Sequence, residues 1–319
     1  MTVLTVAELL ERRGEGLELE VLAGRGGLDG RLESADISSP GLVLAGFTDR
    51  FPLRRMQVLG ETEVRYLESL AARARREVLE RFLAFDVPCV FVTKGLPAPP
   101  ELLALADELS IPVLGSGLKT GEFFRRVKPF LEEVFAPSTA LHGSLADVYG
   151  VGLLFVGASG IGKSECVLDL VERGHRLVAD DVVLASRRGV DVLMGRAVEH
   201  QQFHMEIRGI GIIDVRALFG IRSVRQQKRI EVVVQLEHWR DGASYDRTGL
   251  ATDSTTILDV ALPRVVIPLN PGKNITVISE VVAMRHLLRY AGVDSAALFQ
   301  QNLKSLMQPV RDYLEEDYE

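Results

Sequence analysis

Cysteine is scarce in this chain. Its 319 residues include only Cys89 and Cys166, each in an apolar stretch. Two distant cysteines supply neither zinc-ligand spacing nor a disulfide framework, so a reducing cytosol is the expected setting. Positive charge is not in excess either, because 37 Lys and Arg face 44 Asp and Glu for a net charge of −7. That balance argues against a general nucleic-acid binder.

Long hydrophobic runs are also missing. No stretch approaches the ~18 apolar residues of a membrane helix. The first twenty residues carry acids where a signal peptide would need a charged head and an apolar core. There is no internal repeat and no low-complexity segment. With 47% hydrophobic and 25% charged residues, the chain predicts a globular, cytoplasmic protein of two domains, with no membrane or nucleic-acid partner.

Residues 1–130 form the first expected domain. A short amphipathic helix (VAELLERRG) is followed by strand-like ELEVLAG, and the glycine-rich stretch 24–30 lacks dinucleotide-loop spacing and is interpreted as a turn. Residues 63–85 have apolar positions at helical spacing, which predicts one long surface helix. Helices then alternate with the short strands VPCVFV and IPVLGS, which favours an α/β domain with a parallel sheet.

Residues 131–319 form the second expected domain. A helix ending near Pro137 is expected to bridge the two units. The runs GVGLLFVGASG, HRLVADDVVLAS, RIEVVVQLE and RVVIPLN then make this part rich in strands. Two helical segments close the chain. The fold class predicted from sequence is therefore α/β, with an N-terminal α/β domain of regulatory or assembly role and a C-terminal catalytic domain.

The segment GASGIGKS satisfies the P-loop pattern through Gly157, Gly162, Lys163 and Ser164. Glycines let successive backbone N–H groups surround a phosphate, and the helix that starts at the loop directs its positive end toward the same anion. Lysine then neutralises the β- and γ-phosphates and serine ligates Mg²⁺. The strand LLFV before the motif and the helix ECVLDLVER after it support this interpretation over a chance match.

Asp180 and Asp181 follow the apolar strand RLVA, and Asp180 lies 17 residues after Lys163. An acid at a strand end beside a P-loop typically handles Mg²⁺ or the attacking nucleophile. Strand-end Asp also serves as a turn or capping residue. Beside phosphates, two adjacent carboxylates would not share one environment, so one could orient the metal while the other takes a proton.

Further candidates carry weaker signals. Glu206 precedes a glycine-rich apolar strand and could be a second Mg²⁺ ligand, although a solvated glutamate is the ordinary reading. Arg247 in SYDRTG could touch phosphate or form a surface ion pair. His142 could be a site residue or a buried histidine. His200 and His204, four apart, could share a helical face as metal ligands, but no third ligand has suitable spacing.

Five segments in order, STALHGSLADVYGVGLLFVGASGIGKSE, RGHRLVADDVV, MEIRGIGIIDV, YDRTG and PLNPGKN, resemble the bifunctional HPr kinase/phosphorylase family. SPGLVLAGFTDRF and RMQVLGETE are similar to that family's first domain, so the resemblance covers most of the chain. It implies a kinase of the phosphocarrier HPr of the sugar phosphotransferase system, working with ATP and Mg²⁺. It also implies removal of that phosphate with inorganic phosphate to give pyrophosphate, a phosphate site like that of phosphoenolpyruvate carboxykinase, and a homo-hexamer.

The resemblance also implies roles for single residues. Asp181 would be the base in phosphorylation and the acid in the reverse reaction, with Asp180 beside it, and His142 and Arg247 would be catalytic near the phosphates. Ser164 and Glu206 would hold Mg²⁺. The nucleotide phosphates would bind Gly157, Ala158, Ser159, Gly160, Ile161, Gly162, Lys163 and Ser164. The strand around 205–214, with Arg208, Gly209 and Gly211, would serve both activities, and Pro268, Asn270, Pro271, Gly272 and Lys273 mainly dephosphorylation.

The sequence departs from the family pattern in two places. Ala158 stands where the family commonly has Asp, at a position whose backbone matters more than its side chain. Asn270 and Lys273 stand where arginines are expected; Lys keeps the charge but loses the bidentate fork, and Asn loses the charge. The phosphorylase direction therefore depends on the less well matched segment.

Two alternatives stay open from the sequence. A P-loop kinase of a small molecule would turn over its acceptor with no protein present. A non-catalytic nucleotide-dependent switch would keep the P-loop but would have no need of Asp181 or Arg247, and both are present.

Overall fold

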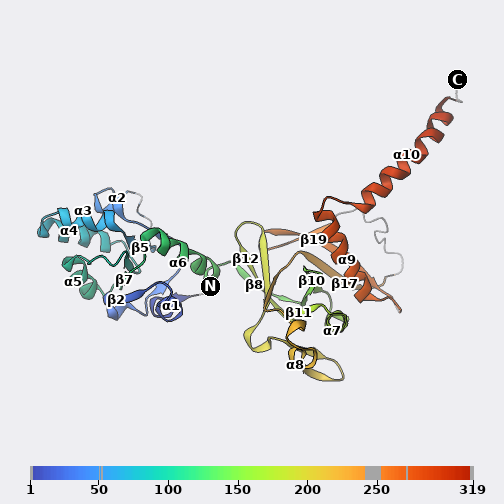
Figure 1. Cartoon of the computed structure of the whole chain (residues 1–319), viewed down its shortest axis with the longest axis horizontal. Helices are drawn as coiled ribbons and strands as arrows, with labels where there is room; N and C mark the ends of the chain where they lie inside the picture. Colours follow the sequence, from blue (N-terminus) through green and yellow to red (C-terminus); the bar gives the residue numbers. More distant parts are fainter. Residues whose placement is uncertain (1–2, 50, 52, 241–252, 271, 317–319) are drawn as a thin grey trace. The chain divides into compact units, whose positions relative to one another are not determined.

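The structure is a computed structural model that describes residues 3–316 apart from 50, 52, 241–252 and 271, with side chains through residue 305. The chain divides into two compact units, Met1–Ala136 and Pro137–Glu319 (Figure 1). The boundary expected at residue 130 would cut helix α6 (Thr120–Val134). This helix does not bridge the units, because Phe123, Val127 and Leu131 are buried in a core of the first unit.

The first unit is a three-layer α/β/α domain. Its strands are β1 (Leu4–Thr5), β2 (Leu19–Ala23), β3 (Arg31–Leu32), β4 (Ile37–Ser38), β5 (Met56–Leu59), β6 (Val90–Val92) and β7 (Val113–Ser116). Its other helices are α1 (Val6–Arg13), α2 (Gly41–Leu44), α3 (Glu61–Ser69), α4 (Ala72–Leu83) and α5 (Pro100–Leu109), with a 3-10 turn at Arg25–Gly27. The main sheet has the order β2-β7-β6-β5-β4, parallel from β4 to β7.

Side chains of this sheet alternate between two cores, as the period of two in a strand requires. Val90 and Val92 pack with α3, α4 and α5 on one face, whereas Phe91 packs with α1 and α6 on the other. Both faces are covered, which explains why the short strands are continuously apolar.

The single helix predicted over residues 63–85 is wrong. Leu70 is extended (φ −84°, ψ 144°) and ends α3, and α4 begins after Ala71. Both helices direct their apolar residues into the same core, Val64 and Leu67 from α3 and Phe82 from α4. Periodicity therefore continues across the break and does not reveal it.

The second unit is built on two stacked sheets. Its strands are β8 (Ser138–His142), β9 (Ser144–Val148), β10 (Val151–Val156), β11 (Arg176–Ala179), β12 (Val182–Arg188), β13 (Val192–Ala197), β14 (His204–Ile207), β15 (Gly211–Asp214), β16 (Gln227–Arg229), β17 (Val232–His238), β18 (Asp253–Ile257) and β19 (Val260–Leu269). Its helices are α7 (Lys163–Glu172), α8 (Val215–Phe219), α9 (Ile275–Tyr290) and α10 (Ser295–Glu316), with 3-10 turns at Glu199–Gln201 and Ile221–Ser223.

The larger sheet has the order β11-β9-β10-β17-β19-β18, and the smaller one β16-β13-β12-β8. Helices α7 and α9 cover one face of the larger sheet, and the smaller sheet covers the other. Strands β10, β17 and β19 are parallel, so their carboxyl ends lie at one edge. Ligands of open α/β sheets bind at such edges. No helix among the described residues is long and apolar enough to cross a membrane.

Candidate functional site

A glycine-rich loop joins β10 to α7 at the carboxyl edge of the larger sheet. It runs from Gly157 to Gly162, and α7 begins at Lys163. Gly157 has φ +150°, and a Cβ there would lie 2.6 Å from the carbonyl oxygen of Leu236 on β17. Only glycine fits this close approach. Ile161 is buried in the core below α7 and fixes the other end of the loop.

The loop borders a hollow of about 140 Å³ that combines segments distant in the sequence. Of the residues predicted from sequence, it brings together His142, Ser159, Gly160, Gly162, Lys163, Ser164, Asp180, Asp181, Glu206 and Arg208. Two further residues line it, Ser144 and Glu165. The hollow therefore unites the ends of β8, β10, β11 and β14.

Asp180 is a buried carboxylate beside the loop. Only 4% of the residue is exposed, and its Oδ1 accepts hydrogen bonds from the hydroxyls of Ser144 at 2.5 Å and Ser164 at 3.0 Å. Its Oδ2 is buried with no hydrogen-bond partner in the described structure. Burial raises the pKa of Asp180, while the two serine hydroxyls oppose that rise. A buried oxygen of this kind suits a cation that completes its coordination.

Ser144 was missed by the sequence analysis. All five residues of β9 are buried, and Ser144 and Asp147 are the polar members of the strand. A polar side chain on a buried strand needs an internal partner. Ser144 finds Asp180, and Asp147 accepts from Arg225 at 2.7 Å. The sequence signal that could have identified Ser144 is a serine at the start of the buried strand SLADV.

Asp181 occupies a different environment from its neighbour. Its side chain is 56% exposed, and its backbone has a φ of +63°, which is uncommon for a non-glycine residue. Nδ1 of His142 lies 3.3 Å from the Asp181 carboxylate and 3.1 Å from its backbone carbonyl. The left-handed backbone thus separates the two carboxylates, one buried against the loop and one open to the hollow.

Lys163 is buried at the start of α7. Its ammonium group donates to the loop carbonyls of Gly157 at 3.2 Å and Ala158 at 3.0 Å. The charge therefore lies directly over the loop. Positive charge beside a helix N-terminus and turned-in backbone N–H groups is an arrangement that binds anions.

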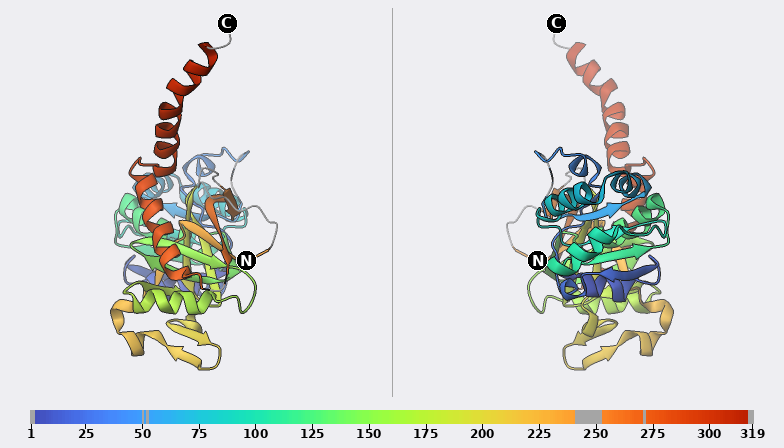
Figure 2. Two further views of the ribbon diagram at one scale, coloured as in Figure 1. Left: turned by 90° about the vertical axis from the view of Figure 1, so that its right-hand side faces the viewer. Right: turned by 90° about the vertical axis from the view of Figure 1, so that its left-hand side faces the viewer.

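Glu206 and Arg208 reach the hollow from a hairpin, not from the single strand predicted over residues 205–214. Strands β14 and β15 pair antiparallel, and Gly209 and Gly211 reverse the chain with φ of +84° and +100°. Figure 2 shows this hairpin, in yellow, beside the green helix α7. Met205 and Ile207 are buried under α7, so Glu206 and Arg208 lie on the opposite side of the strand.

The histidine pair does not form a metal site. His200 lies in a 3-10 turn and His204 begins β14, so the helical face that would align them does not exist. Within the described residues, no group of three His, Cys, Asp or Glu side chains is placed to hold a metal ion.

Among the described residues of the segment after β19, none lines the hollow. Pro268 belongs to β19, and the Lys273 ammonium donates to its carbonyl at 2.9 Å, while the Lys273 N–H bonds the Asn270 carbonyl at 3.1 Å. With Gly272 this turn lies at the same sheet edge as the loop. Arg247 and Pro271 lie outside the described residues.

An ionic cluster around the buried carboxylate of Glu280 braces the far end of α7. Glu280 on α9 accepts from Arg173 at 2.7 and 2.9 Å and lies 3.1 Å from His175, whose ring meets Tyr149 edge to face. The Arg173 guanidinium and His175 lower the pKa of Glu280 to about 2, with desolvation opposing. The cluster ties the helix that carries Lys163 to α9.

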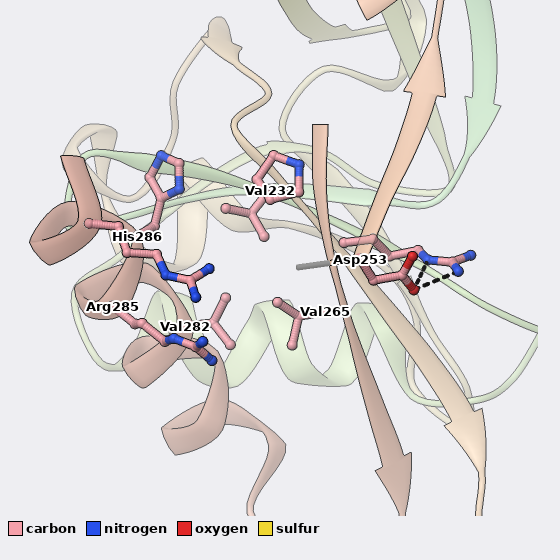
Figure 3. Close-up of a pocket in the computed structure, with 9 residues that line it drawn as sticks. Val232, Asp253, Val265, Val282, Arg285 and His286 are labelled. Carbon is pink, nitrogen blue, oxygen red and sulfur yellow. Dashed lines mark hydrogen bonds and ion pairs between the residues drawn. The ribbon is translucent and has the colours of Figure 1, made fainter. Parts of the chain in front are cut away.

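A second hollow lies in the same unit, between α9 and the strands β17 and β19, and has a volume of about 70 Å³. Figure 3 shows Arg285 and His286 on one side, Asp253 on the other and Val232, Val265 and Val282 between them. Asp253 already bonds Arg264 at 2.7 and 3.0 Å. None of the residues predicted from the sequence lines it, so the loop hollow is the candidate site.

A strand, a glycine-rich turn and a helix, with a buried lysine and an exposed acid around one hollow, make this an α/β protein whose hollow has an arrangement suited to binding anions. The model of the HPr Serine kinase N terminus matches residues 4–131, and that of the HPr Serine kinase C-terminal domain matches residues 133–303. The chain belongs to the HPr kinase/phosphorylase family, which confirms the resemblance inferred from the sequence.

Relatives match nearly the whole chain. The HPr kinase/phosphorylase of Chloroherpeton thalassium is 45% identical over 299 residues, 91% of this chain and 88% of that protein. That of Geobacter sulfurreducens is 44% identical over 305 residues and 96% of each chain. Among solved structures, the Hpr(Ser) kinase/phosphatase from Coxiella burnetii is 31% identical and covers 50% of this chain and 98% of that chain, with a TM-score of 0.45. The family is therefore one of enzymes, as predicted.

Proposed function

We propose that this protein is a Mg²⁺-dependent kinase that transfers the γ-phosphoryl group of ATP to a serine of the phosphocarrier HPr. We propose that it also acts as a phosphorylase of the phosphorylated carrier. The observation that carries the proposal is one hollow in which the exposed carboxylate of Asp181 faces a glycine-rich loop and the Lys163 ammonium. The finer fold that goes with it is a P-loop kinase domain with a phosphate site like that of phosphoenolpyruvate carboxykinase.

Asp181 is suited to the role of base. A serine hydroxyl is a weak nucleophile until a carboxylate within hydrogen-bond reach takes its proton. As the serine oxygen bonds to the γ-phosphorus, the bond to the β–γ bridging oxygen breaks and ADP leaves. Asp181 holds the serine proton, and His142, 3.3 Å from its carboxylate, orients it. Because the transition state is loose, the remaining task is charge neutralisation, to which Lys163 contributes.

The reverse direction uses the same groups. Inorganic phosphate attacks the phosphoserine phosphorus, the bond to the serine oxygen breaks, and pyrophosphate is formed. Asp181, protonated in this direction, returns its proton to the serine oxygen. The loop that would hold the β- and γ-phosphates of ATP presents the same N–H groups to pyrophosphate.

The residues present fit Mg²⁺. Three oxygen ligands lie around the hollow: Ser164 Oγ, the Glu206 carboxylate, and Asp180 Oδ2, which is buried and has no hydrogen-bond partner among the described residues. Mg²⁺ prefers oxygen ligands and is usually held by one or two carboxylates plus phosphates and water, which agrees with a site lacking a three-carboxylate cluster in the described part of the chain. When bound, it would neutralise charge on the phosphate oxygens.

HPr is the proposed acceptor because curated relatives at 44–45% identity are named HPr kinase/phosphorylase. A homo-hexamer with the C-terminal units at its centre, and a regulatory or assembly role for the N-terminal unit, are parts of the same proposal.

The test is transfer of label from γ-labelled ATP to purified HPr with Mg²⁺, followed by a chase with inorganic phosphate. We expect labelled HPr that then loses its label as pyrophosphate. Label that resists the chase would leave a kinase only, and would implicate Asn270 and Lys273. No label on HPr would contradict the proposal, and label on a small molecule would favour the alternative kinase. Binding of ATP with no transfer to any acceptor would favour a switch.

A further inference from the structure

Arg208 reaches the phosphate loop from the tip of the β14–β15 hairpin. It follows Ile207, which is buried in the core beneath α7, and Glu206, which lines the same hollow. The buried neighbour anchors the hairpin, so the arginine is presented from a fixed element rather than from a free loop.

The guanidinium lies directly against the loop at Gly160. A Cβ built on Gly160 would be 2.7 Å from both Cζ and Nη2 of Arg208. Side-chain atoms do not approach a real Cβ so closely, so any residue other than glycine would have to displace the guanidinium. Gly160 also has φ +75°. A side chain at position 160 would therefore shift the guanidinium from its place against the loop and would also be strained by the positive φ.

The charge of Arg208 has no protein partner within the described part of the chain, where it forms neither an ion pair nor a side-chain hydrogen bond. Arg173 and Arg225 of this unit are paired, whereas arginines that are likewise unpaired within the described residues, such as Arg196 and Arg222, do not line the hollow. Arg173 bonds Glu280 and Arg225 bonds Asp147, each at 2.7 Å. An unpaired fork of five donors facing a phosphate loop is the arrangement that recognises phosphate oxygens.

We propose that Arg208 is a phosphate-binding residue of this site, which donates to the terminal phosphate oxygens of ATP and to pyrophosphate, and that Gly160 is glycine to admit it. The inference rests on the proposed function and adds a second cation to Lys163. Lys163 reaches the loop from α7, whereas Arg208 reaches it from the hairpin. Together they neutralise the anion from two elements.

The first experiment measures equilibrium binding of ATP and of pyrophosphate, each with Mg²⁺, to the full chain by titration calorimetry. Arg208→Gln should raise the Kd of both at least about tenfold, because a charge-assisted bond is lost. Arg208→Lys should give Kd values between those of the wild type and Arg208→Gln, because lysine keeps the charge but lacks the planar fork of donors. The control is Arg216→Gln, which removes the same charge from α8, outside the hollow, and should leave both Kd values unchanged.

A double-mutant cycle tests the link to Gly160. Gly160→Ala should weaken ATP binding more in the wild-type background than in the Arg208→Gln background, because it displaces the guanidinium only in the first, whereas strain from the positive φ is common to both. Gly162→Ala is the matched control: Gly162 also has positive φ, +102°, but a Cβ there meets nothing within 4 Å. Its effect should be additive with Arg208→Gln.

Wild-type Kd values in Arg208→Gln would overturn the inference, as would a rise only in the KM for HPr, which would place the arginine against the protein acceptor. Additive effects of Gly160→Ala and Arg208→Gln would overturn the link between them. If the wild-type chain bound neither ATP nor pyrophosphate, the proposed function itself would fail, so the two failures are distinguishable.

Discussion

Both units place polar and charged groups near the carboxyl ends of parallel strands, but the units differ in whether those groups have partners within the protein. In the N-terminal unit, α3 begins after β5, and its Gly60 N–H is already bonded by Glu63 at 2.9 Å. Lys94, which follows β6, is bonded by Glu61 at 2.7 Å. In the C-terminal unit, Asp180 Oδ2 and Arg208 have no such partner in the described structure. At these strand ends the N-terminal groups are satisfied within the protein, whereas the two groups beside the loop hollow keep hydrogen-bonding capacity that a ligand could use.

The substitution with the largest expected effect removes a charge beside the loop hollow of the C-terminal unit. Lys163→Ala removes the buried ammonium that lies over the loop carbonyls. We expect the rate of phosphoryl transfer to HPr to fall about 10²–10³-fold, the usual cost of losing a donor that stabilises developing charge. Initial rates at saturating ATP measure it. A loss smaller than threefold would mean that the loop does not hold the transferred phosphate.

The Glu280 cluster is a group of charges in the C-terminal unit that, like those at the N-terminal strand ends, is paired within the protein. Glu280→Gln removes the negative charge and replaces one of the two acceptor oxygens with a donor, so Arg173 and His175 share a single neutral acceptor. We expect the free energy of unfolding to fall by about 2 kcal/mol, less than for a fully buried pair because Arg173 is 48% exposed. Urea unfolding at pH 7 measures it.

The stability difference between the wild type and Glu280→Gln should also depend on pH. Glu280 has a folded pKa of about 2, below its usual 4.5, so its stabilisation is complete above about pH 4.5 and is lost as the pH falls toward 2. The difference in unfolding free energy between wild type and Glu280→Gln should therefore shrink between pH 4.5 and 2. A difference that stayed constant over that range would contradict the assignment.

Ser144 tests whether the orientation of Asp180 matters. Ser144→Val removes the hydroxyl that donates to Asp180 at 2.5 Å. Ser144→Thr keeps a hydroxyl in a side chain of nearly the same shape as valine, so it is the matched control. We expect the Val variant to need several-fold more Mg²⁺ for half-maximal transfer than the Thr variant, because one of two donors fixing the carboxylate is lost. The measurement is the rate of transfer to HPr as a function of Mg²⁺ concentration for the two variants. Equal midpoints would mean that Ser144 only fills space.

The smallest effect belongs to the N-terminal unit. Glu61→Gln removes the exposed partner of Lys94, and exposed ion pairs contribute little to stability. We expect an unchanged rate of transfer and little change in the thermal midpoint. A large loss of transfer rate would show that the strand ends of this unit also serve the reaction, and the comparison between the units would fail.

Much of the site could be predicted from sequence because its parts are local. The loop between β10 and α7 is specified by residues 151–172, where an apolar strand, glycines and a helix follow directly. The acidic pair after β11 is similarly visible. Pairings between distant segments could not be predicted. Ser144 meets Asp180 only because β9 and β11 are neighbours in the sheet, and Arg208 meets Gly160 only because a hairpin packs beside α7.

The errors in the fold have the same origin. The break at Leu70 leaves the apolar period intact, so only the backbone reveals it. The stretch 205–214 alternates like one strand, but the left-handed conformations of Gly209 and Gly211 turn it into two. In both places a local pattern was compatible with two chain paths, and packing against the rest of the unit decided between them.

The most direct test of the central claim compares Asp181→Asn with the wild type, measuring ATP binding and transfer to HPr in the same preparations. Asp181 is exposed to the hollow and stands apart from the buried loop contacts. We expect a Kd for ATP close to that of the wild type and a transfer rate lower by about 10²-fold or more, since the proposed base is lost while the phosphate site remains. Full transfer activity in Asp181→Asn would contradict it.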